Sequence, residues 1–513
     1  MMLAPEWMKN AKFPFGCVLI ANRGEVACRI ARACKELQLS TVAIYTSSDN
    51  NSPLLDLCDQ NYLLEGETLQ ETFLNIEAII DAAKKTGAQA IHPGFGFLSE
   101  SAKFAKAVTE AELVWIGPSP ESIEIMGDKM SAREKMKSVG VPLVPGHEVY
   151  STKINEIHKE LIDASSKLGF PLLLKASAGG GGKGMRVVNR PSELAEAIEA
   201  AQREAQTAFG DGRIYVEKLL TDCKHIEIQI LADGYGNILH LGERECSLQR
   251  RHQKVIEECP SPAIGERLRN LMGAAGIAAA AAVTYMGAGT VEFLLDEDKF
   301  YFLEMNTRLQ VEHPVTEFVT GIDIVHEQFR IAAGLPLGMS QKQISMKGHS
   351  IESRVYAEDP SSGFLPSAGP LLRLTMPQGP GIRIDSGVVE GNIIDTNFDP
   401  MIAKIIVHAN DRETAIMRMK NALRETVLLG LQTNIEFLHA LLCDEDVVNG
   451  NTDTNLIERK WPNGWTPPND SELFALGAMA CIISEKRGPA YSSQSNNNVI
   501  NNDPFLKLNS KFP

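Results

Sequence analysis

Apolar residues in the first quarter of the chain recur with two different spacings. Short apolar runs predict strands, in chain order, at 17–21, 41–45, 88–91 and 113–116. Between these strands, apolar residues at helical spacing predict helices at 26–37 and 76–84. This strand–helix–strand alternation is typical of a doubly wound α/β domain, which we expect over residues 1–127.

The loop His92–Phe97 directly follows the predicted strand at 88–91. Open parallel sheets bind ligands beyond the carboxyl ends of their strands, so this loop is a candidate binding loop. Turn formation explains its glycines equally well.

Farther along the chain, two apolar runs flank a run of glycines. The apolar runs at 171–175 and 185–188 predict paired strands, so the glycines between them form the tip of a hairpin. We place this hairpin in a small α+β lid, at about 143–218. Strands at 225–231 and 238–242 then belong to a larger domain that reaches residue 462.

Two further stretches have an unusual composition. Leu271–Val291 carries no charge, but it consists mostly of alanine and glycine and is interrupted by Thr284–Gly289. It therefore predicts an alanine-rich core helix that leads into a buried strand rather than a membrane span. Residues 463–513 are polar and mostly aperiodic, so we expect disorder there except near 472–483.

The composition argues against several classes of protein. The net charge of −15 disfavours nucleic-acid binding, because an acidic chain repels phosphate backbones. Nine cysteines without a Cys-x-x-Cys pair favour reduced thiols over a disulfide framework or a zinc site. The first residues show neither an apolar signal core nor an Arg/Ser-rich transit pattern. We therefore expect a cytoplasmic protein, or a mitochondrial matrix protein if a transit peptide was removed.

The glycine run lies between cationic side chains, from Lys175 to Arg186. Glycine reaches positive φ without strain, so successive backbone N–H groups can converge on one anion, and Lys183 adds positive charge. This combination predicts a loop that closes over the phosphates of ATP. It is not a Walker loop, because Gly184 follows Lys183 where that motif requires Ser or Thr. A flexible glycine linker is the alternative.

A predicted hairpin from Val291 to Arg308 carries acidic residues on otherwise apolar strands. Side chains alternate across a strand, so Glu304, Asn306 and Arg308 share one face. Glu292 approaches this face from the partner strand. Two carboxylates and an amide oxygen are suitable ligands for Mg²⁺. The alternative is a pair of acidic residues on a solvated sheet face.

Two polar segments, Gln249–Lys254 and Gln310–Glu317, are candidates for further chemistry. A carboxylate near a metal site could act as a base, and a cluster of Arg, His and Lys could hold a small anion. A surface ion-pair network explains either segment equally well. Sequence spacing does not place the two segments in one pocket.

Eight ordered motifs resemble those of one family: 20–25, 92–100, 127–129, the glycine run, 250–254, 304–308, 312–317 and 357–360. Over residues 16–462 the chain resembles the biotin carboxylases of the ATP-grasp superfamily, which are components of acetyl-CoA, propionyl-CoA, methylcrotonyl-CoA and pyruvate carboxylases. The resemblance implies an α/β ATP-grasp fold with a mobile glycine-loop lid. The implied parts are an N-terminal domain (1–127), an ATP-grasp region (128–345), a C-terminal biotin carboxylase domain (346–462) and the tail (463–513).

The resemblance also implies a two-step ligation. Bicarbonate attacks the γ-phosphate of ATP to give carboxyphosphate, and its CO₂ then passes to the ureido nitrogen of biotin. Mg²⁺ or Mn²⁺ is held by Glu292, Glu304 and Asn306. The residues that correspond to the ATP contacts of the family are Lys129, Lys175, Gly179, Gly180, Gly181, Gly182, Gly184, Met185, Glu217, Lys218, Leu220, His225, Gln249 and His252.

The remaining implied roles concern bicarbonate and biotin. The bicarbonate contacts are Lys254, Arg308, Gln310 and Val311. Glu312 matches the general base of the family, and Arg354 matches the arginine that stabilises the enolate form of biotin. We therefore expect Lys254, Arg308, Glu312 and Arg354 to be the catalytic residues.

The chain contains no Ala-Met-Lys-Met or similar tetrapeptide for the attachment of biotin. We therefore expect biotin on a separate carrier protein, or on a missing part of a longer chain. The segment Leu473–Leu476, which resembles biotin-containing subunits, favours a fragment or a split subunit. The other expected partners are a carboxyltransferase subunit and a second copy of this chain. Two alternatives stay open: another ATP-grasp carboxylate–amine ligase, and an inactive nucleotide-binding regulatory subunit.

Overall fold

The computed structural model describes residues 13–149, 154–177, 184–395, 398–467 and 477. The chain divides into two units, Met1–Thr466 and Pro467–Pro513, and the first of them is described below. The four glycines at 179–182, and most of the tail for which we predicted disorder, lie outside the described residues.

The N-terminal part is a parallel sheet with the strand order β3-β2-β1-β4-β5. One apolar core lies under α1 and a second lies under α3 and α4, which confirms the predicted doubly wound arrangement. The polar strand β3 was not predicted. The elements are β1 Cys17–Ile20, α1 Gly24–Glu36, β2 Ser40–Tyr45, α2 Pro53–Leu57, β3 Gln60–Leu63, α3 Ile76–Thr86, β4 Ala90–His92, α4 Ala102–Glu110, β5 Val114–Trp115 and α5 Pro120–Gly127.

The order of the strands in this sheet reverses between β1 and β4, and the loop after β4 lies at this point. The side-chain amide of Asn22, which follows β1, donates to the carbonyls of Pro93 and Phe95 at 2.7 Å each. The candidate loop His92–Phe97 therefore lies at the carboxyl end of a strand, as the sequence predicts. The structure adds that this is a topological switch point of the sheet.

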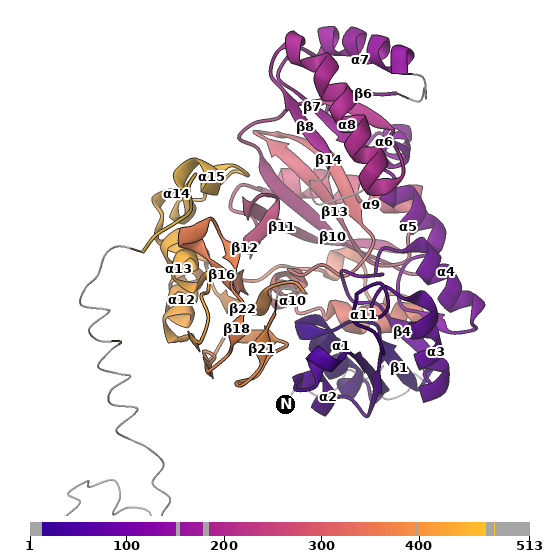
Figure 1. Ribbon diagram of the computed structural model, residues 1–513, viewed down its shortest axis with the longest axis vertical. Helices are drawn as coiled ribbons and strands as arrows, with labels where there is room; N and C mark the ends of the chain where they lie inside the picture. The colour runs from indigo at the N-terminus through magenta and orange to yellow at the C-terminus, as the bar shows by residue number, and fades with distance from the viewer. Residues whose placement is uncertain (1–12, 150–153, 178–183, 396–397, 468–476, 478–513) are drawn as a thin grey trace, which may run out of the picture. The chain divides into compact units, whose positions relative to one another are not determined.

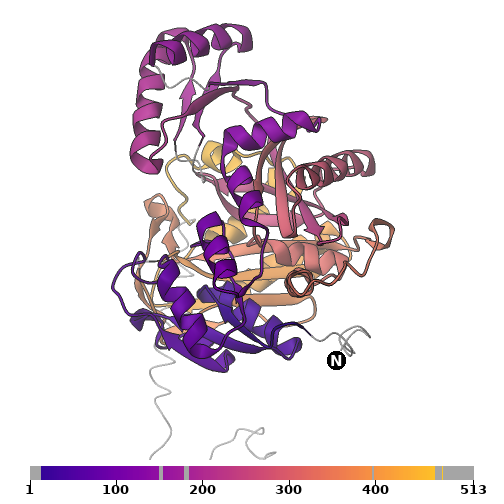
Figure 2. The ribbon, with the colours of Figure 1, turned by 90° about the vertical axis from the view of Figure 1, so that its right-hand side faces the viewer.

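A small antiparallel sheet with the strand order β6-β9-β7-β8 forms the predicted lid. Helices α7 and α8 pack along it (Figures 1 and 2), and all residues of its apolar core come from the lid itself. Strands β7 and β8 pair antiparallel, as predicted for the arms of the glycine hairpin. The elements are β6 Gly146–Glu148, α7 Ile154–Leu168, β7 Leu172–Ala176, β8 Met185–Val188, α8 Leu194–Phe209 and β9 Ile214–Lys218, preceded by α6 Lys129–Ser138.

An eight-stranded antiparallel sheet, β14-β13-β10-β11-β12-β15-β22-β20, is the centre of the unit (Figure 1). Its strands and the helices packed on it are β10 Lys224–Ala232, β11 Ile238–Arg250, β12 Gln253–Cys259, α9 Glu266–Ala282, β13 Gly287–Asp296, β14 Lys299–Asn306, α10 His313–Thr320, α11 Ile324–Ala332, β15 His349–Tyr356, β20 Ile382–Ser386 and β22 Met401–Ala409. The predicted alanine-rich helix and buried strand are α9 and β13. None of the described helices is long and apolar enough to cross a membrane.

The two faces of this sheet have different chemistry. On β10, Ile226, Ile228 and Ile230 belong to the apolar core that α9 covers. The alternate residues His225, Glu227 and Gln229 are also buried, but on the opposite face, where α10 crosses β11, β12, β15 and β22. Because both faces are covered, the sheet can hold buried polar groups against α10.

The last part of the unit completes the far end of the sheet. Its core packs α12 and α13 against β15 and β22. The remaining elements are β16 Glu358–Asp359, β17 Leu365–Pro366, β18 Gly369–Pro370, β19 Arg373–Thr375, β21 Ile393–Ile394, α12 Arg412–Glu425, β23 Val427–Leu429, α13 Ile435–Cys443, α14 Glu445–Val448 and α15 Leu456–Lys460.

Candidate active site

Lys254 on β12 lies among three buried carboxylates from different elements. Its Nζ lies 2.7 Å from Glu227 Oε2, 2.9 Å from Glu292 Oε1 and 2.7 Å from Glu312 Oε1. Burial opposes a charge on Lys254, but these carboxylates outweigh it and hold the pKa of the lysine well above its usual range. The ammonium therefore stays charged and connects β10, β13 and the start of α10.

Glu312 is the residue before α10, and both of its carboxylate oxygens have cationic partners. Oε1 contacts Lys254, and Oε2 accepts a hydrogen bond from Arg354 Nη2 at 2.8 Å. The side chain is fully buried, which favours the neutral acid, but Lys254 and Arg354 outweigh this and hold the pKa of Glu312 well below its usual range. Glu312 is therefore an ionised carboxylate, the form that a proton acceptor requires.

Arg244 and Glu227 are functional candidates that the sequence analysis missed. Arg244 is fully buried and forms an ion pair with Glu227. It also donates to Gln229 at 2.7 Å, to Thr316 at 2.9 Å and to Thr290 at 3.1 Å. The signal was present in the sequence, because His225, Glu227 and Gln229 alternate with isoleucines, and charged residues in such a strand need buried partners.

Glu292 and Glu304 face each other directly across the β13–β14 ladder. Glu292 accepts from Asn306 at 2.8 Å and contacts His225 Nε2 at 2.9 Å. Burial favours its neutral form, but Lys254 and His225 outweigh this and lower the pKa of Glu292. For Glu304, burial and the neighbouring Glu292 raise the pKa, although Lys129 opposes this.

No hydrogen bond to the Glu304 side chain forms among the described residues. Two facing carboxylates, one of them without a donor, and an amide oxygen nearby make a hard-oxygen donor set. The residues present therefore fit a divalent cation such as Mg²⁺ or Mn²⁺.

Three of the residues predicted to hold bicarbonate, Lys254, Arg308 and Gln310, come together beside Glu292. Arg308 donates from Nη1 to Gln310 Oε1 and from Nη2 to Asn306 Oδ1, both at 3.0 Å. Gln310 Nε2 in turn donates to Glu292 Oε1 at 3.2 Å. Glu100, in the motif after β4, accepts from Arg308 Nε at 2.9 Å. The contact between Lys254 and Glu312 joins the two polar segments, 249–254 and 310–317, that sequence spacing could not place in one pocket.

The lid lysine Lys175 has a buried partner. Its Nζ lies 3.0 Å from Glu217 Oε2, and Glu217 also pairs with Arg133. Lys129 is tied to the end of β7 through its backbone, which donates to the Ser177 carbonyl at 2.9 Å. Burial lowers the pKa of the Lys129 ammonium despite the nearby Glu304. The negative phosphates of a nucleotide bound beside Lys129 would favour its charged form.

Four other predicted ATP contacts, Lys218, Leu220, Gly184 and Met185, lie in the lid or directly after it. Lys218 Nζ donates to the carbonyls of Gly169 and Phe170, at 3.1 Å and 2.9 Å, so backbone groups of the lid occupy its ammonium. Leu220 follows β9 and is half-buried. Gly184 has a φ of +73°, and its carbonyl accepts from the Ala176 N–H at 3.0 Å. It lies at the described base of the hairpin, directly before Met185, the first residue of β8.

Gln249 and His252 lie on the β11–β12 hairpin, beside Lys254. Gln249 is buried and pairs with Lys254 across the ladder. His252 is exposed in the two-residue turn, with a φ of +65°, and Arg251 before it has a φ of +48°. The turn thus carries His252 at a strained backbone position.

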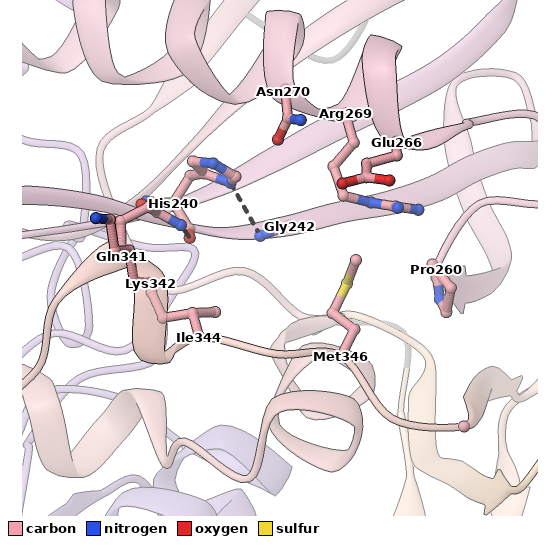
Figure 3. Close-up of a pocket in the computed structure, with 11 residues that line it drawn as sticks. His240, Gly242, Pro260, Glu266, Arg269, Asn270, Gln341, Lys342, Ile344 and Met346 are labelled. Atoms are coloured by element: carbon pink, nitrogen blue, oxygen red, sulfur yellow. Dashed lines mark hydrogen bonds between the residues drawn. The ribbon is translucent and has the colours of Figure 1, made fainter.

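A separate cavity of about 530 Å³ lies between β11, the start of α9 and residues 341–348 (Figure 3). Its lining includes His240, Arg269 and Met346 but no predicted site residue. Arg269 already forms two hydrogen bonds of 2.7 Å with Glu243. The predicted functional residues therefore lie outside this cavity, around Lys254.

Three family models match the chain: the N-terminal domain of biotin carboxylase at 14–123, the ATP-binding domain of the carbamoyl-phosphate synthase L chain at 128–340, and the C-terminal domain of biotin carboxylase at 352–459. The biotin carboxylase of Nostoc sp. is 48% identical over 445 residues, which cover 86% of this chain and 99% of that protein. The chain belongs to the biotin carboxylase family. This confirms the predicted family and the predicted class of enzyme, an ATP-dependent ligase.

Other biotin carboxylase relatives belong to larger assemblies. The mitochondrial methylcrotonoyl-CoA carboxylase subunit alpha of Dictyostelium discoideum is 44% identical over 476 residues, which cover 92% of this chain and 68% of that subunit. The biotin carboxylase domain dimer of Hydrogenobacter thermophilus 2-oxoglutarate carboxylase, solved with MgADP, ADP and bicarbonate, is 44% identical. Its TM-score is 0.84, covering 89% of this chain and 100% of that chain. The predicted ATP-grasp biotin carboxylase fold is therefore confirmed.

Proposed function

We propose that this chain uses ATP and bicarbonate to carboxylate biotin, as the first half-reaction of a biotin-dependent carboxylase. The observation that carries the proposal is the position of Glu312, a buried and ionised carboxylate held between Lys254 and Arg354. This arrangement supplies a base, a cation for an anionic substrate and a cation for a second oxyanion within one cluster.

In the first step, a bicarbonate oxygen attacks the γ-phosphate of ATP and ADP leaves, and bicarbonate needs to lose a proton as the new bond forms. Lys254 and Arg308 hold the anion, and the Glu312 carboxylate accepts its proton. The product, carboxyphosphate, is protected when the glycine lid excludes water.

Phosphoryl transfer requires that the charge on the transferred group be neutralised. Lys129 and Lys175 are the lysines that we assign to the phosphates of ATP. Glu292, Glu304 and Asn306 would hold Mg²⁺ or Mn²⁺, which when bound neutralises charge on phosphate oxygens. The pKa of Glu292 is lowered and that of Glu304 is raised, in part by repulsion from Glu292. This supports the assignment, because a bound cation would offset that repulsion.

In the second step, CO₂ from carboxyphosphate passes to the ureido nitrogen of biotin, and the released phosphate accepts the nitrogen's proton. Arg354 faces the developing enolate oxygen of biotin. We propose that biotin arrives on a carrier protein or domain, that a carboxyltransferase subunit receives the product, and that the chain forms a homodimer. The dimeric structure of the Hydrogenobacter thermophilus relative supports the last point.

The deciding experiment compares two buried glutamates of the same segment. ATP hydrolysis is measured with Mg²⁺, with and without bicarbonate and free biotin, for the wild type, Glu312→Gln and Glu317→Gln. Glu317 pairs with Arg29 at 3.1 Å and with Arg383 at 2.7 Å, away from Lys254. We expect Glu312→Gln to lower bicarbonate-dependent, biotin-stimulated turnover by about 100-fold or more, while Glu317→Gln lowers stability but keeps this turnover.

A wild-type chain that binds ATP but shows no bicarbonate-dependent turnover would overturn the proposal. It would favour another ATP-grasp ligase or an inactive nucleotide-binding subunit. Equal losses in Glu312→Gln and Glu317→Gln would contradict the role of Glu312 as the base.

A further inference from the structure

Lys404 is a fully buried lysine in the middle of the apolar strand β22. In the sheet it stands directly opposite Arg354 on β15, and Asp385 on β20 stands on its other side. Residues opposite one another in a ladder point to the same face. Lys404 and Arg354 therefore reach toward the same covering segment, which is the start of α10.

The two side chains hold consecutive residues of that segment. Arg354 donates to the carboxylate of Glu312 at 2.8 Å, and Lys404 Nζ donates to the backbone carbonyl of Val311 at 2.5 Å. Val311 and Glu312 precede α10, where no regular secondary structure fixes the backbone. The contact from Lys404 restrains the peptide that joins these two residues.

A buried ammonium persists only where its charge is paired. Lys404 Nζ lies 3.3 Å from Glu25 Oε1 on α1 and 3.9 Å from Asp385 Oδ2. Burial opposes the charge, but Glu25, Glu352 and Asp385 outweigh it and raise the pKa of Lys404. The acidic partners thus keep Lys404 cationic, and its hydrogen bond to Val311 is charge-assisted and strong.

We propose that Lys404 is a positioning residue for the bicarbonate step. Through the Val311 carbonyl it sets the orientation of Glu312 and of the backbone beside it, while Arg354 holds the carboxylate itself. A base must lie within hydrogen-bond reach of the proton that it accepts, so a small shift of this peptide weakens the reaction with bicarbonate and leaves ATP binding intact. This inference rests on the function proposed above.

The test uses a charge-balanced pair of variants of the full chain. Lys404→Met with Glu25→Gln removes one cation and one carboxylate together, so no new unpaired charge is buried. Glu25→Gln alone is the matched control, because it loses the same carboxylate but keeps the bond from Lys404 to Val311. The readouts are kcat, the KM for bicarbonate, the KM for ATP and the melting temperature.

We expect the double variant to raise the KM for bicarbonate about tenfold or more over Glu25→Gln, with the KM for ATP changed less than about twofold. Lys404→Arg keeps a cationic donor but enlarges a fully buried side chain, and we expect it to raise the KM for bicarbonate about threefold. An unchanged KM for bicarbonate in whichever of these variants folds overturns the proposal. The wild type tells this outcome from failure of the proposed function. If the proposed function is wrong, the wild-type chain itself shows no bicarbonate-dependent turnover.

Discussion

Single residues in this site have protonation states that depend on their buried neighbours. Glu292 accepts hydrogen bonds from Lys254, Asn306 and Gln310 and contacts His225, whereas Glu304 opposite it has no hydrogen-bond donor among the described residues. Burial and repulsion therefore raise the pKa of Glu304 while cationic partners lower that of Glu292. A carboxylate placed for a cation destabilises the chain without that cation.

The two facing glutamates should respond in opposite ways to the same substitution. In metal-free buffer we expect Glu304→Gln to raise the melting temperature, because a repulsive carboxylate is removed. Glu292→Gln should lower it, because Lys254 loses a partner. Both variants should lose Mg-ATP turnover by about 100-fold or more. Melting curves with and without Mg²⁺ check this, and equal shifts of both variants in metal-free buffer would contradict it.

Glu25 gives the chain a predictable dependence of stability on pH. Burial, offset only in part by Lys404, raises its pKa from 4.5 to about 7. Between these values the folded chain holds a proton that the unfolded chain has lost, so this residue's contribution to stability is present below pH 4.5 and falls as the pH rises to about 7. In Glu25→Gln, the melting temperature should fall less than in the wild type between about pH 5 and about pH 8. Parallel pH profiles of the two proteins would contradict this.

The sequence predicted residues that stand in compact polar motifs, and it missed residues that act alone on apolar strands. Lys254, Arg308 and Glu312 fall in dense polar segments, and they lie together in the fold. Arg244 and Lys404 are single cations in buried strands, and their partners are 17 and 93 residues away. Such long-range pairings depend on strand register, which periodicity does not reveal.

At the scale of elements, the β11–β12 hairpin has an unusual turn. Arg251 and His252 both have positive φ, and they connect the paired residues Arg250 and Gln253. Two-residue turns of this kind favour Asn-Gly, so the bulky pair is strained by about 1 kcal/mol or more per residue. Strain kept at a turn beside Lys254 is consistent with a functional role for His252.

A substitution that relieves the strain in this turn should stabilise the fold and, where it removes His252, weaken the use of ATP. We expect His252→Gly to stabilise the fold by about 0.5–1 kcal/mol while raising the KM for ATP. Arg251→Asn should also stabilise the fold but leave the KM for ATP unchanged, because His252 is retained. Denaturant unfolding and steady-state kinetics on both variants provide the comparison. A loss of stability in His252→Gly would show that the turn is not strained.

Elements were predicted best where their hydrophobic pattern was strong. The strands β1, β2 and β4, the helix α3 and the hairpin β13–β14 lie within a few residues of their predicted positions. Strand β3, Gln60–Leu63, was missed because it lies at a sheet edge and exposes three of its four residues, so it shows no apolar run. The glycine-loop lid was predicted from its two arms, but the tip itself lies outside the described residues.

At the scale of the whole unit, one sheet crosses the predicted boundary between residues 345 and 346. Strands β10 to β14 come before it and β15, β20 and β22 after it, and β12 pairs with β15. Arg354 on β15 completes the site by contacting Glu257 and Glu312, which lie before the boundary. The lid, in contrast, has an apolar core made only of its own residues.

This arrangement predicts two levels of stability within the chain. Hydrogen exchange of the full chain should show β12 and β15 protected together, because they share one ladder, and β7 and β8 exchanging faster, because the lid can open without disturbing the sheet. ATP with Mg²⁺ should slow exchange in β7 and β8 and change the sheet little, since the lid closes over the nucleotide. If β15 and β22 exchange well before β10 to β13, the segment after residue 345 unfolds on its own. The site would then lose Arg354 each time that this segment unfolds.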